Sequence, residues 1–279
     1  MKWLVYGGKG WIGSQLLQLL SNEDVTVGEA RVDSPEDVEK ELLLYQPDRV
    51  VSLIGRTHGP GFTTIDYLEQ KGKLQENIKD NLYSPLVLAL LCTKYNIHFT
   101  YLGTGCIFNG YPENGYTEED EPDFFGSSYS VVKGFTDRLM HLFPHALNVR
   151  IRMPIVDYNC PRNFITKIMT YKKICSLPNS LTVLPELLPV MLDASRKGLE
   201  GTLNLCNPGL ISHNEILEMV KEYVDPEFTW ENFTLEEQDK ILASSRSNNY
   251  LCTKRLEELY PNVLPVKESL KNILMKYKK

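Results

Sequence analysis

A short apolar run at the start of the chain leads directly into a glycine-rich loop. The run is Lys2–Tyr6, and Gly7, Gly10 and Gly13 follow it, after which apolar residues recur at helical spacing through Leu20. This pattern predicts a strand, a sharp turn and an amphipathic helix. Glycines let a ligand approach the backbone closely, and a helix N-terminus offers phosphates free N–H groups and a positive dipole end. The unit therefore predicts a dinucleotide-binding α/β fold.

Strand-like and helix-like segments alternate through about the first 150 residues. Further strands are expected at residues 25–27, 49–54, 99–102 and 146–151, and helices at about residues 35–45, 71–94 and 129–143. Ser34 is expected to cap the first of these helices, with Asp37 completing a capping box. Because strands that alternate with helices are typical of a parallel sheet, we predict a Rossmann-type doubly wound sheet over residues 1–153.

The pattern changes from about Pro154 onward, where the sequence becomes rich in proline and asparagine. A return strand is expected at residues 201–205 and a helix at residues 212–224. We predict a smaller, interleaved C-terminal lobe over residues 154–279 that binds substrate, with return strands near residues 181–206 that join the sheet. His213 is expected at a helix start, where Ser212 and Glu215 can form a capping box, so we assign it no catalytic role.

Charge and cysteine usage narrow the class of partner. The formal net charge of -6 argues against a nucleic-acid-binding protein. No apolar run approaches the ~20 residues that a membrane span needs. The six cysteines are scattered, without a CxxC pair or a Cys/His cluster, which predicts reduced thiols and no metal site. We expect a cytoplasmic protein that acts on small molecules.

The residues after the second predicted strand bear on the choice of dinucleotide. Arg31, helped by Lys9, can bind a 2′-phosphate and so favours NADPH, whereas Glu29 keeps NADH possible. Asp33 can accept a hydrogen bond from the adenine amino group. The predicted cofactor-binding residues come from the glycine loop, the ends of the second and third strands and two helices: Gly7, Lys9, Gly10, Trp11, Ile12, Gly13, Arg31, Asp33, Ile54, Gly55, Arg56, Asn81, Tyr129 and Lys133.

A tyrosine and a lysine four residues apart suggest the chemistry. Tyr129 and Lys133 share one face of a predicted helix, and a nearby ammonium lowers the pKa of a phenol, so Tyr129 can exchange a proton with a carbonyl oxygen. Thr104 follows the strand predicted at residues 99–102, at the edge where doubly wound sheets bind ligands. Together with the glycine loop, these residues resemble the extended short-chain dehydrogenase/reductase superfamily.

A closer resemblance covers nearly the whole chain. Residues 104–108, 123–127, 161–168, 212–219 and 246–249 resemble the UDP-4-keto-6-deoxyglucose 3,5-epimerase/4-reductase family, which makes UDP-L-rhamnose in plants and some giant viruses. The resemblance implies the fold of dTDP-4-dehydrorhamnose reductases, NADPH as cofactor, a UDP-sugar substrate and a homodimer. The chain departs from the family mainly at residues 56–70, where it is more similar to the viral members.

The resemblance also implies roles for individual residues. Cys106 and Lys167 match the positions implicated in epimerisation, while Thr104 and Tyr129 would hold the carbonyl oxygen and Lys133 would assist reduction. The predicted substrate-binding residues are Cys106, Ile107, Phe108, Arg162, Asn163, Lys167, Arg246, Asn248 and Asn249.

Two other functions stay open at this point. A reductase without epimerase activity would need neither Cys106 nor Lys167. A non-catalytic regulatory subunit could keep the fold and bind nucleotide, although the intact Thr104, Tyr129 and Lys133 count against it. The sequence leaves open UDP or dTDP in the substrate, the relative use of NADPH and NADH, and the oligomeric state.

Overall fold

A six-stranded parallel sheet forms the centre of the molecule. The computed structural model describes residues 1–277, so the last two residues of the predicted 154–279 lobe lie outside the described part. The strand order is β10-β5-β4-β3-β1-β2, and every pairing is parallel. The predicted Rossmann-type α/β sheet is confirmed. Its strands are β1 (Lys2–Tyr6), β2 (Asp24–Val27), β3 (Arg49–Ser52), β4 (His98–Thr104), β5 (Ala146–Ile151) and β10 (Gly201–Asn204).

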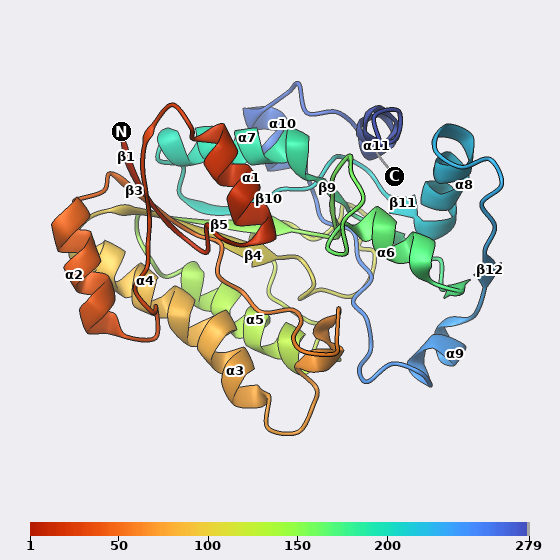
Figure 1. Cartoon of the computed structure of the whole chain (residues 1–279), viewed down its shortest axis with the longest axis horizontal. Coiled ribbons are helices and arrows are strands. Elements are labelled where there is room, and N and C mark those ends of the chain that lie inside the picture. The colour runs from red at the N-terminus through yellow and green to blue at the C-terminus, as the bar shows by residue number, and fades with distance from the viewer. Residues whose placement is uncertain (278–279) are drawn as a thin grey trace.

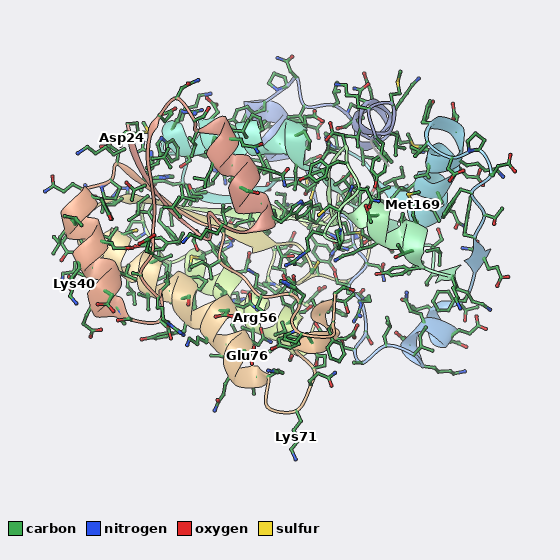
Figure 2. The ribbon with its side chains drawn as sticks, viewed as in Figure 1. Asp24, Lys40, Arg56, Lys71, Glu76 and Met169 are labelled. Atoms are coloured by element: carbon green, nitrogen blue, oxygen red, sulfur yellow. The ribbon has the colours of Figure 1, made fainter. Side chains whose placement is uncertain are left out.

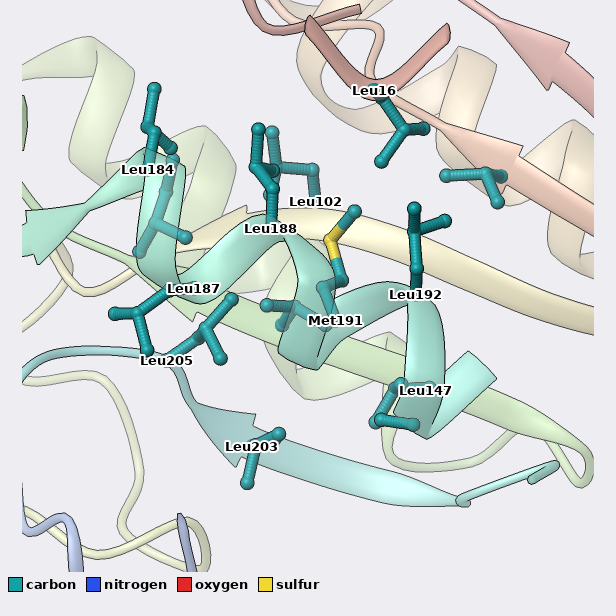
Figure 3. Close-up of a cluster of buried hydrophobic side chains, with 14 of the residues drawn as sticks. Leu16, Leu102, Leu147, Leu184, Leu187, Leu188, Met191, Leu192, Leu203 and Leu205 are labelled. Atoms are coloured by element: carbon teal, nitrogen blue, oxygen red, sulfur yellow. The ribbon is translucent and has the colours of Figure 1, made fainter. Parts of the chain in front are cut away.

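Helices cover both faces of this sheet (Figure 1). One face carries α1 (Trp11–Leu19) and α7 (Leu184–Arg196), and the other carries α2 (Pro35–Tyr45), α4 (Ser84–Lys94) and α5 (Ser128–Met140). Figure 3 shows leucines and Met191 of α7 packed with Leu16 of α1 and with Leu147 and Leu203 of the sheet. Because both faces are covered, β4 and β5 are buried along their whole length.

Two local predictions on the α2–α4 face are corrected. The helix expected at residues 71–94 is divided into α3 (Leu74–Ile78), a π-helical turn η2 (Lys79–Tyr83) and α4. Ser34 stands at the N-cap position of α2, but its side chain makes no capping bond to the backbone. Its hydroxyl instead donates to the Asp37 carboxylate at 2.8 Å, and Lys40 binds the other oxygen of that carboxylate. The predicted capping box is therefore wrong.

The C-terminal part builds a third core beside the sheet. It is formed by α6 (Phe164–Thr170), α8 (His213–Tyr223) and α11 (Val266–Leu274). The capping box predicted from Ser212 and Glu215 is present at the start of α8. Short elements complete this part: β6 (Pro154–Ile155), β7 (Lys173–Ile174), β8 (Pro178–Asn179), β9 (Thr182–Val183), β11 (Ile211–Ser212), β12 (Glu231–Asn232), α9 (Leu235–Asp239) and α10 (Lys254–Leu259).

The strand order determines where a ligand fits. β2 and β3 lie on opposite sides of β1, so the chain changes direction across the sheet between β1 and β3. Ligands of open α/β sheets bind at such a switch point, beyond the carboxyl ends of the strands. Within residues 1–277, no helix is both long enough and apolar enough to cross a membrane.

Candidate active site

A cavity of about 1150 Å³ lies at the carboxyl edge of the sheet. The glycine loop after β1 and residues 53–55, 57 and 58 after β3 line one end of it, while α6 and the segment after β12 line the other. Between them lie the end of β4 and the start of α5. The cavity therefore extends from the predicted cofactor loop into the C-terminal part of the chain.

Steric contacts explain why the loop needs glycine. Gly7 has a φ of 79°, and a Cβ there would lie 2.9 Å from the carbonyl carbon of Leu53. At Gly13 a Cβ would lie 2.2 Å from the carbonyl oxygen of Gly7. Gly10 is different, because the nearest atom to its Cβ would be that same oxygen at 3.2 Å. Gly10 caps α1 and lines the cavity together with Trp11 and Ile12, so its missing side chain leaves room for a ligand.

The residues that bear on the choice of dinucleotide lie on the surface after β2 and in the loop, outside the cavity lining. The Arg31 side chain is 73% exposed and binds Asp33 at 3.1 Å, and Asp33 also pairs with Lys79. The hydrogen bonds from Arg31 and Lys79 lower the pKa of Asp33. Lys9 and Glu29 form a looser exposed pair at 3.9 Å. Both signs of charge are thus present near the glycine loop, which lines one end of the cavity.

The π-helical turn η2 fixes the loop after β3. Asn81 is fully buried; its Oδ1 accepts a hydrogen bond from the backbone N–H of Arg56 at 2.9 Å, and its Nδ2 donates to the Arg56 carbonyl at 2.9 Å. The Arg56 side chain binds Asp80 at 2.5 Å and lies 3.8 Å from Glu76. Figure 2 shows Arg56 and Glu76 close together. Ile54, Gly55 and Asn81 line the cavity, so a π-turn lies at the candidate site, as such turns frequently do.

Thr104, Tyr129 and Lys133 all line the cavity, and Tyr129 is hydrogen-bonded to Thr104. Thr104 is the last residue of β4 rather than a residue beyond it, and the other two lie on α5. All three are buried. Burial raises the pKa of Tyr129, with a contribution from Cys106, while its hydrogen bond with Thr104 acts in the opposite direction. The net shift of this pKa is therefore upward, where a lowering was predicted, and the Lys133 ammonium donates its hydrogen bond to Tyr101 and not to Tyr129.

Cys106 and Lys167 approach the same cavity from separate elements. Cys106 follows β4, and its backbone N–H donates to Thr104 Oγ1 at 3.1 Å. Lys167 lies on α6 and is half-buried, with its Nζ 3.4 Å from the carbonyl oxygen of Thr63. Burial, followed by the positive charge of Arg162, lowers the pKa of Lys167. An amine of lowered pKa is better suited to accept a proton near neutral pH.

The other predicted substrate residues fall into two groups. Arg162, Arg246 and Asn248 line the cavity; Arg162 pairs with His58, and Arg246 binds Asp66 at 2.5 Å. The second group is completely buried and does not line the cavity, and its members are Ile107, Phe108, Asn163 and Asn249.

The buried group supports the cavity wall. Asn249 Nδ2 donates to the carbonyl oxygens of Gly105 and Phe108 at 2.8 and 2.9 Å, which fixes the loop after β4. The Asn163 side chain caps α6 through the backbone N–H of Ile165.

Several cavity residues were not predicted from the sequence. His58 and Asp66 lie in residues 56–70, where the resemblance to the family is weak. His213 does line the cavity, although burial lowers its pKa to about 4 and keeps the ring neutral. Tyr101, which does not line the cavity, was also missed: alternation along β4 predicts the face of the sheet on which its side chain lies, but not its hydrogen bond with Lys133 on α5.

Comparison with known proteins agrees with this geometry. Residues 1–139 match the family model of the RmlD substrate binding domain. The L780 protein of Acanthamoeba polyphaga mimivirus is 55% identical over 100% of this chain and 99% of its own. Its crystal structure, that of a UDP-rhamnose synthase, has a TM-score of 0.96 and covers 99% of both chains.

Plant relatives extend the comparison. A bifunctional dTDP-4-dehydrorhamnose 3,5-epimerase/dTDP-4-dehydrorhamnose reductase of Arabidopsis thaliana is 40% identical over 96% of this chain and 90% of its own. A dTDP-4-dehydrorhamnose reductase from Bacillus anthracis, solved in complex with NADP, shares the fold with a TM-score of 0.81 at 17% identity, over 99% and 100% of the two chains. The full-length matches to the viral and plant proteins show that this chain belongs to the UDP-4-keto-6-deoxyglucose 3,5-epimerase/4-reductase family, the UDP-rhamnose synthases.

Proposed function

We propose that this protein converts UDP-4-keto-6-deoxy-D-glucose to UDP-L-rhamnose by 3,5-epimerisation followed by reduction at C4. One observation carries the proposal: the reductive set of Thr104, Tyr129 and Lys133 and the proton-transfer pair of Cys106 and Lys167 line a single cavity. The glycine loop lines the same cavity, so cofactor and sugar can meet there. The 55% identity to a UDP-rhamnose synthase supports the choice of substrate.

Epimerisation follows from the acidity of the substrate. The protons on C3 and C5 lie next to the C4 carbonyl, so a base can remove either one and leave an enolate. Thr104 and Tyr129 hold the C4 oxygen and stabilise the negative charge that develops on it. Cys106 and Lys167 remove and return the protons; because they come from different elements, they can act on different carbons and faces of the ring.

Reduction uses the other side of the same site. When bound, the nicotinamide cofactor supplies a hydride to C4. Tyr129 gives its hydroxyl proton to the C4 oxygen, and the charge of Lys133, one helical turn away, stabilises the phenolate that is left.

The remaining assignments are part of the same proposal. NADPH is the preferred cofactor, because Arg31 and Lys9 provide positive charge next to the glycine loop. The part of the chain from residue 154 binds the nucleotide-sugar, with Arg162 and Arg246 as diphosphate ligands.

The protein works in the cytoplasm, which suits its six unpaired cysteines. It is a homodimer, since large apolar side chains are exposed on α4 and α5.

One reaction mixture tests the function. Purified protein with NADPH and UDP-4-keto-6-deoxyglucose should oxidise the nucleotide and yield UDP-rhamnose, followed by absorbance and by NMR of the sugar. Nucleotide oxidation that occurs only when the sugar is supplied already epimerised would favour a plain reductase. The absence of both exchange and oxidation, with nucleotide still bound, would favour a regulatory subunit.

A further inference from the structure

Tyr101 lies in the core next to the candidate reductive site and contacts Lys133 of that site. It stands three residues before Thr104 on β4, and its side chain is completely buried in the core between the sheet and helices α2, α4 and α5. Its hydroxyl accepts a hydrogen bond from Lys133 Nζ. The same nitrogen lies 4.6 Å from the centre of the Tyr101 ring, which adds a cation–π contact. Strand β4 thus provides both Thr104 and the residue that binds Lys133.

Lys133 depends on this contact. Within the described residues 1–277, the Lys133 ammonium donates its hydrogen bond to Tyr101 and forms no ion pair. Asp137, one turn further along α5, is occupied by Arg150 at 2.9 and 2.7 Å and by Asn148 at 2.7 Å. A buried ammonium without a partner is strongly disfavoured. The Tyr101 hydroxyl and ring therefore account for how this charge can be buried.

Few other ionisable groups act on Lys133. Burial lowers its pKa to about 8, while Asp137 and Cys106 act in the opposite direction. Tyr129 lies one turn away on the same helix. Burial raises the pKa of Tyr101 well above its ordinary value, so its hydroxyl stays neutral. The ionisable groups on the other elements that pack against α5 either form ion pairs with residues other than Lys133 or lie in the apolar core. They are Arg150 on β5, Glu76 on α3, Asp80 on η2, and Cys92 and Lys94 on α4.

We propose that Tyr101 is a positioning residue of the reductive step, whose hydroxyl holds the Lys133 ammonium against the sheet so that it stays charged while Tyr129 gives up its proton. The inference rests on the proposed function for the role of Lys133. A neutral hydroxyl stabilises the ammonium as an acceptor without adding a negative charge that would oppose the phenolate of Tyr129. Epimerisation by Cys106 and Lys167 does not use Lys133 and is independent of Tyr101.

Tyr101→Phe is the informative variant, because it removes the hydroxyl and keeps the ring. The control is Tyr260→Phe, which removes a hydroxyl bound to Asp193 of α7 at 2.9 Å, on the other side of the sheet and outside the cavity. Both variants are assayed for reduction of an already epimerised keto sugar across pH, and for exchange of ring protons in heavy water.

The expected result separates reduction from proton exchange. In Tyr101→Phe the kcat of reduction should fall about tenfold, the size expected for the loss of one hydrogen bond to a charged group. The basic limb of its pH profile should move down by about one unit, since the ammonium loses the group that stabilises it. KM and exchange at C3 and C5 should match those of Tyr260→Phe. An unchanged pH profile would overturn the proposal, and so would equal losses of reduction and exchange, which would indicate a merely structural role.

A second measurement does not depend on turnover. The Nζ of Lys133 can be titrated by NMR in protein with ¹⁵N-labelled lysine, with Lys133→Met to assign the signal. Its pKa should be lower in Tyr101→Phe than in the native protein, and an equal pKa would refute the role of Tyr101. If the native protein fails to reduce the sugar, the proposed function fails by itself, and this titration still decides whether Tyr101 holds the ammonium charged.

Discussion

At the scale of single residues, substitutions of Cys106 and Lys167 test whether epimerisation is separate from reduction, as we propose. Cys106→Ala and Lys167→Ala should each lose some or all of the exchange of ring protons for deuterium in heavy water without cofactor. The reason is that each variant removes one proton acceptor that approaches the ring from its own direction, whereas Thr104, Tyr129 and Lys133 are left in place. NMR of the 4-keto sugar measures exchange at C3 and C5 separately, so the two residues can be assigned to the two carbons.

Both variants should still bind NADPH and reduce a sugar that is supplied already epimerised. Cys252→Ala is the matched control, since Cys252 is also a half-buried free thiol but does not line the cavity. Full exchange at both carbons in both variants would remove Cys106 and Lys167 from the mechanism and leave the plain reductase as the better description.

Arg31 is the residue that we propose to favour NADPH over NADH. Arg31→Ala should weaken NADPH binding about tenfold and leave NADH binding nearly unchanged, because only NADPH carries the 2′-phosphate that a guanidinium binds well. The pair that Arg31 forms with Asp33 is exposed and contributes little to folding, so the loss of affinity can be interpreted directly. Fluorescence titration with each nucleotide measures it. Lys40→Ala, which breaks a similar exposed pair with Asp37, should change neither affinity.

At the scale of elements, the glycine loop makes two different demands on its glycines. Gly10→Val should keep the fold and abolish NADPH binding, because a Cβ at this position meets only the Gly7 carbonyl oxygen, at 3.2 Å, while the rest of the side chain would fill the cavity. Gly13→Ala should instead lower the melting temperature, since its Cβ would lie 2.2 Å from that oxygen. Thermal unfolding and nucleotide titration distinguish the two, and a Gly10→Val variant of unchanged affinity would contradict the placement of the cofactor.

The same contrast explains what could be predicted from the sequence. The strand, loop and helix of residues 2–20 are specified by local periodicity and glycine spacing, so their bounds are nearly as predicted. The contact of Lys133 with Tyr101 joins positions 32 apart, and that of Arg246 with Asp66 joins positions 180 apart. Such contacts depend on how elements pack, which no local pattern encodes. The π-turn η2 was missed for a similar reason, because its backbone path is stabilised by Asn81 binding a distant loop.

A buried ion pair joins α5 to the sheet. Burial favours the neutral form of Asp137, but its hydrogen bonds with Arg150 and His141 outweigh burial and lower the pKa to about 2. Because this value is below that of the unfolded chain, the stabilisation is complete above about pH 4 and is lost as the pH falls toward 2. The contribution lost is about 2 kcal/mol. Urea unfolding across this range should show a steeper loss of stability for the native protein than for Asp137→Asn, whereas the exposed Asp239→Asn should follow the native curve.

At the scale of the whole molecule, one sheet edge and one separate core enclose the cavity. The glycine loop, Thr104 and the start of α5 are fixed by the sheet, while Lys167 and Arg162 are fixed by α6 and the core around it. The two parts meet through contacts such as Arg162 with His58 and Arg246 with Asp66, each of which joins the C-terminal part to residues 56–70. Of the two residues proposed for proton transfer, Cys106 is therefore held on the sheet side and Lys167 by the separate core.

The outer face of α4 and α5 leads to a prediction about assembly. Leu90 on α4, Phe135 on α5 and Leu142 just after it are 60%, 57% and 75% exposed, and the two helices pack side by side (Figure 1). Large exposed apolar side chains on two helices that pack together can form a surface that is buried against a partner. A second copy of the chain fits the homodimer that we propose, so the protein should sediment at twice its 32.0 kDa mass. Sedimentation velocity across micromolar concentrations measures this directly.

Phe135→Glu combined with Leu90→Glu should shift the protein to the monomer and keep NADPH binding, because neither side chain lines the cavity. Leu19→Glu, on α1 across the sheet, should leave the dimer intact. A native protein that is monomeric at all these concentrations would contradict the homodimer, and a dimer that survives the double substitution would place its interface on another face.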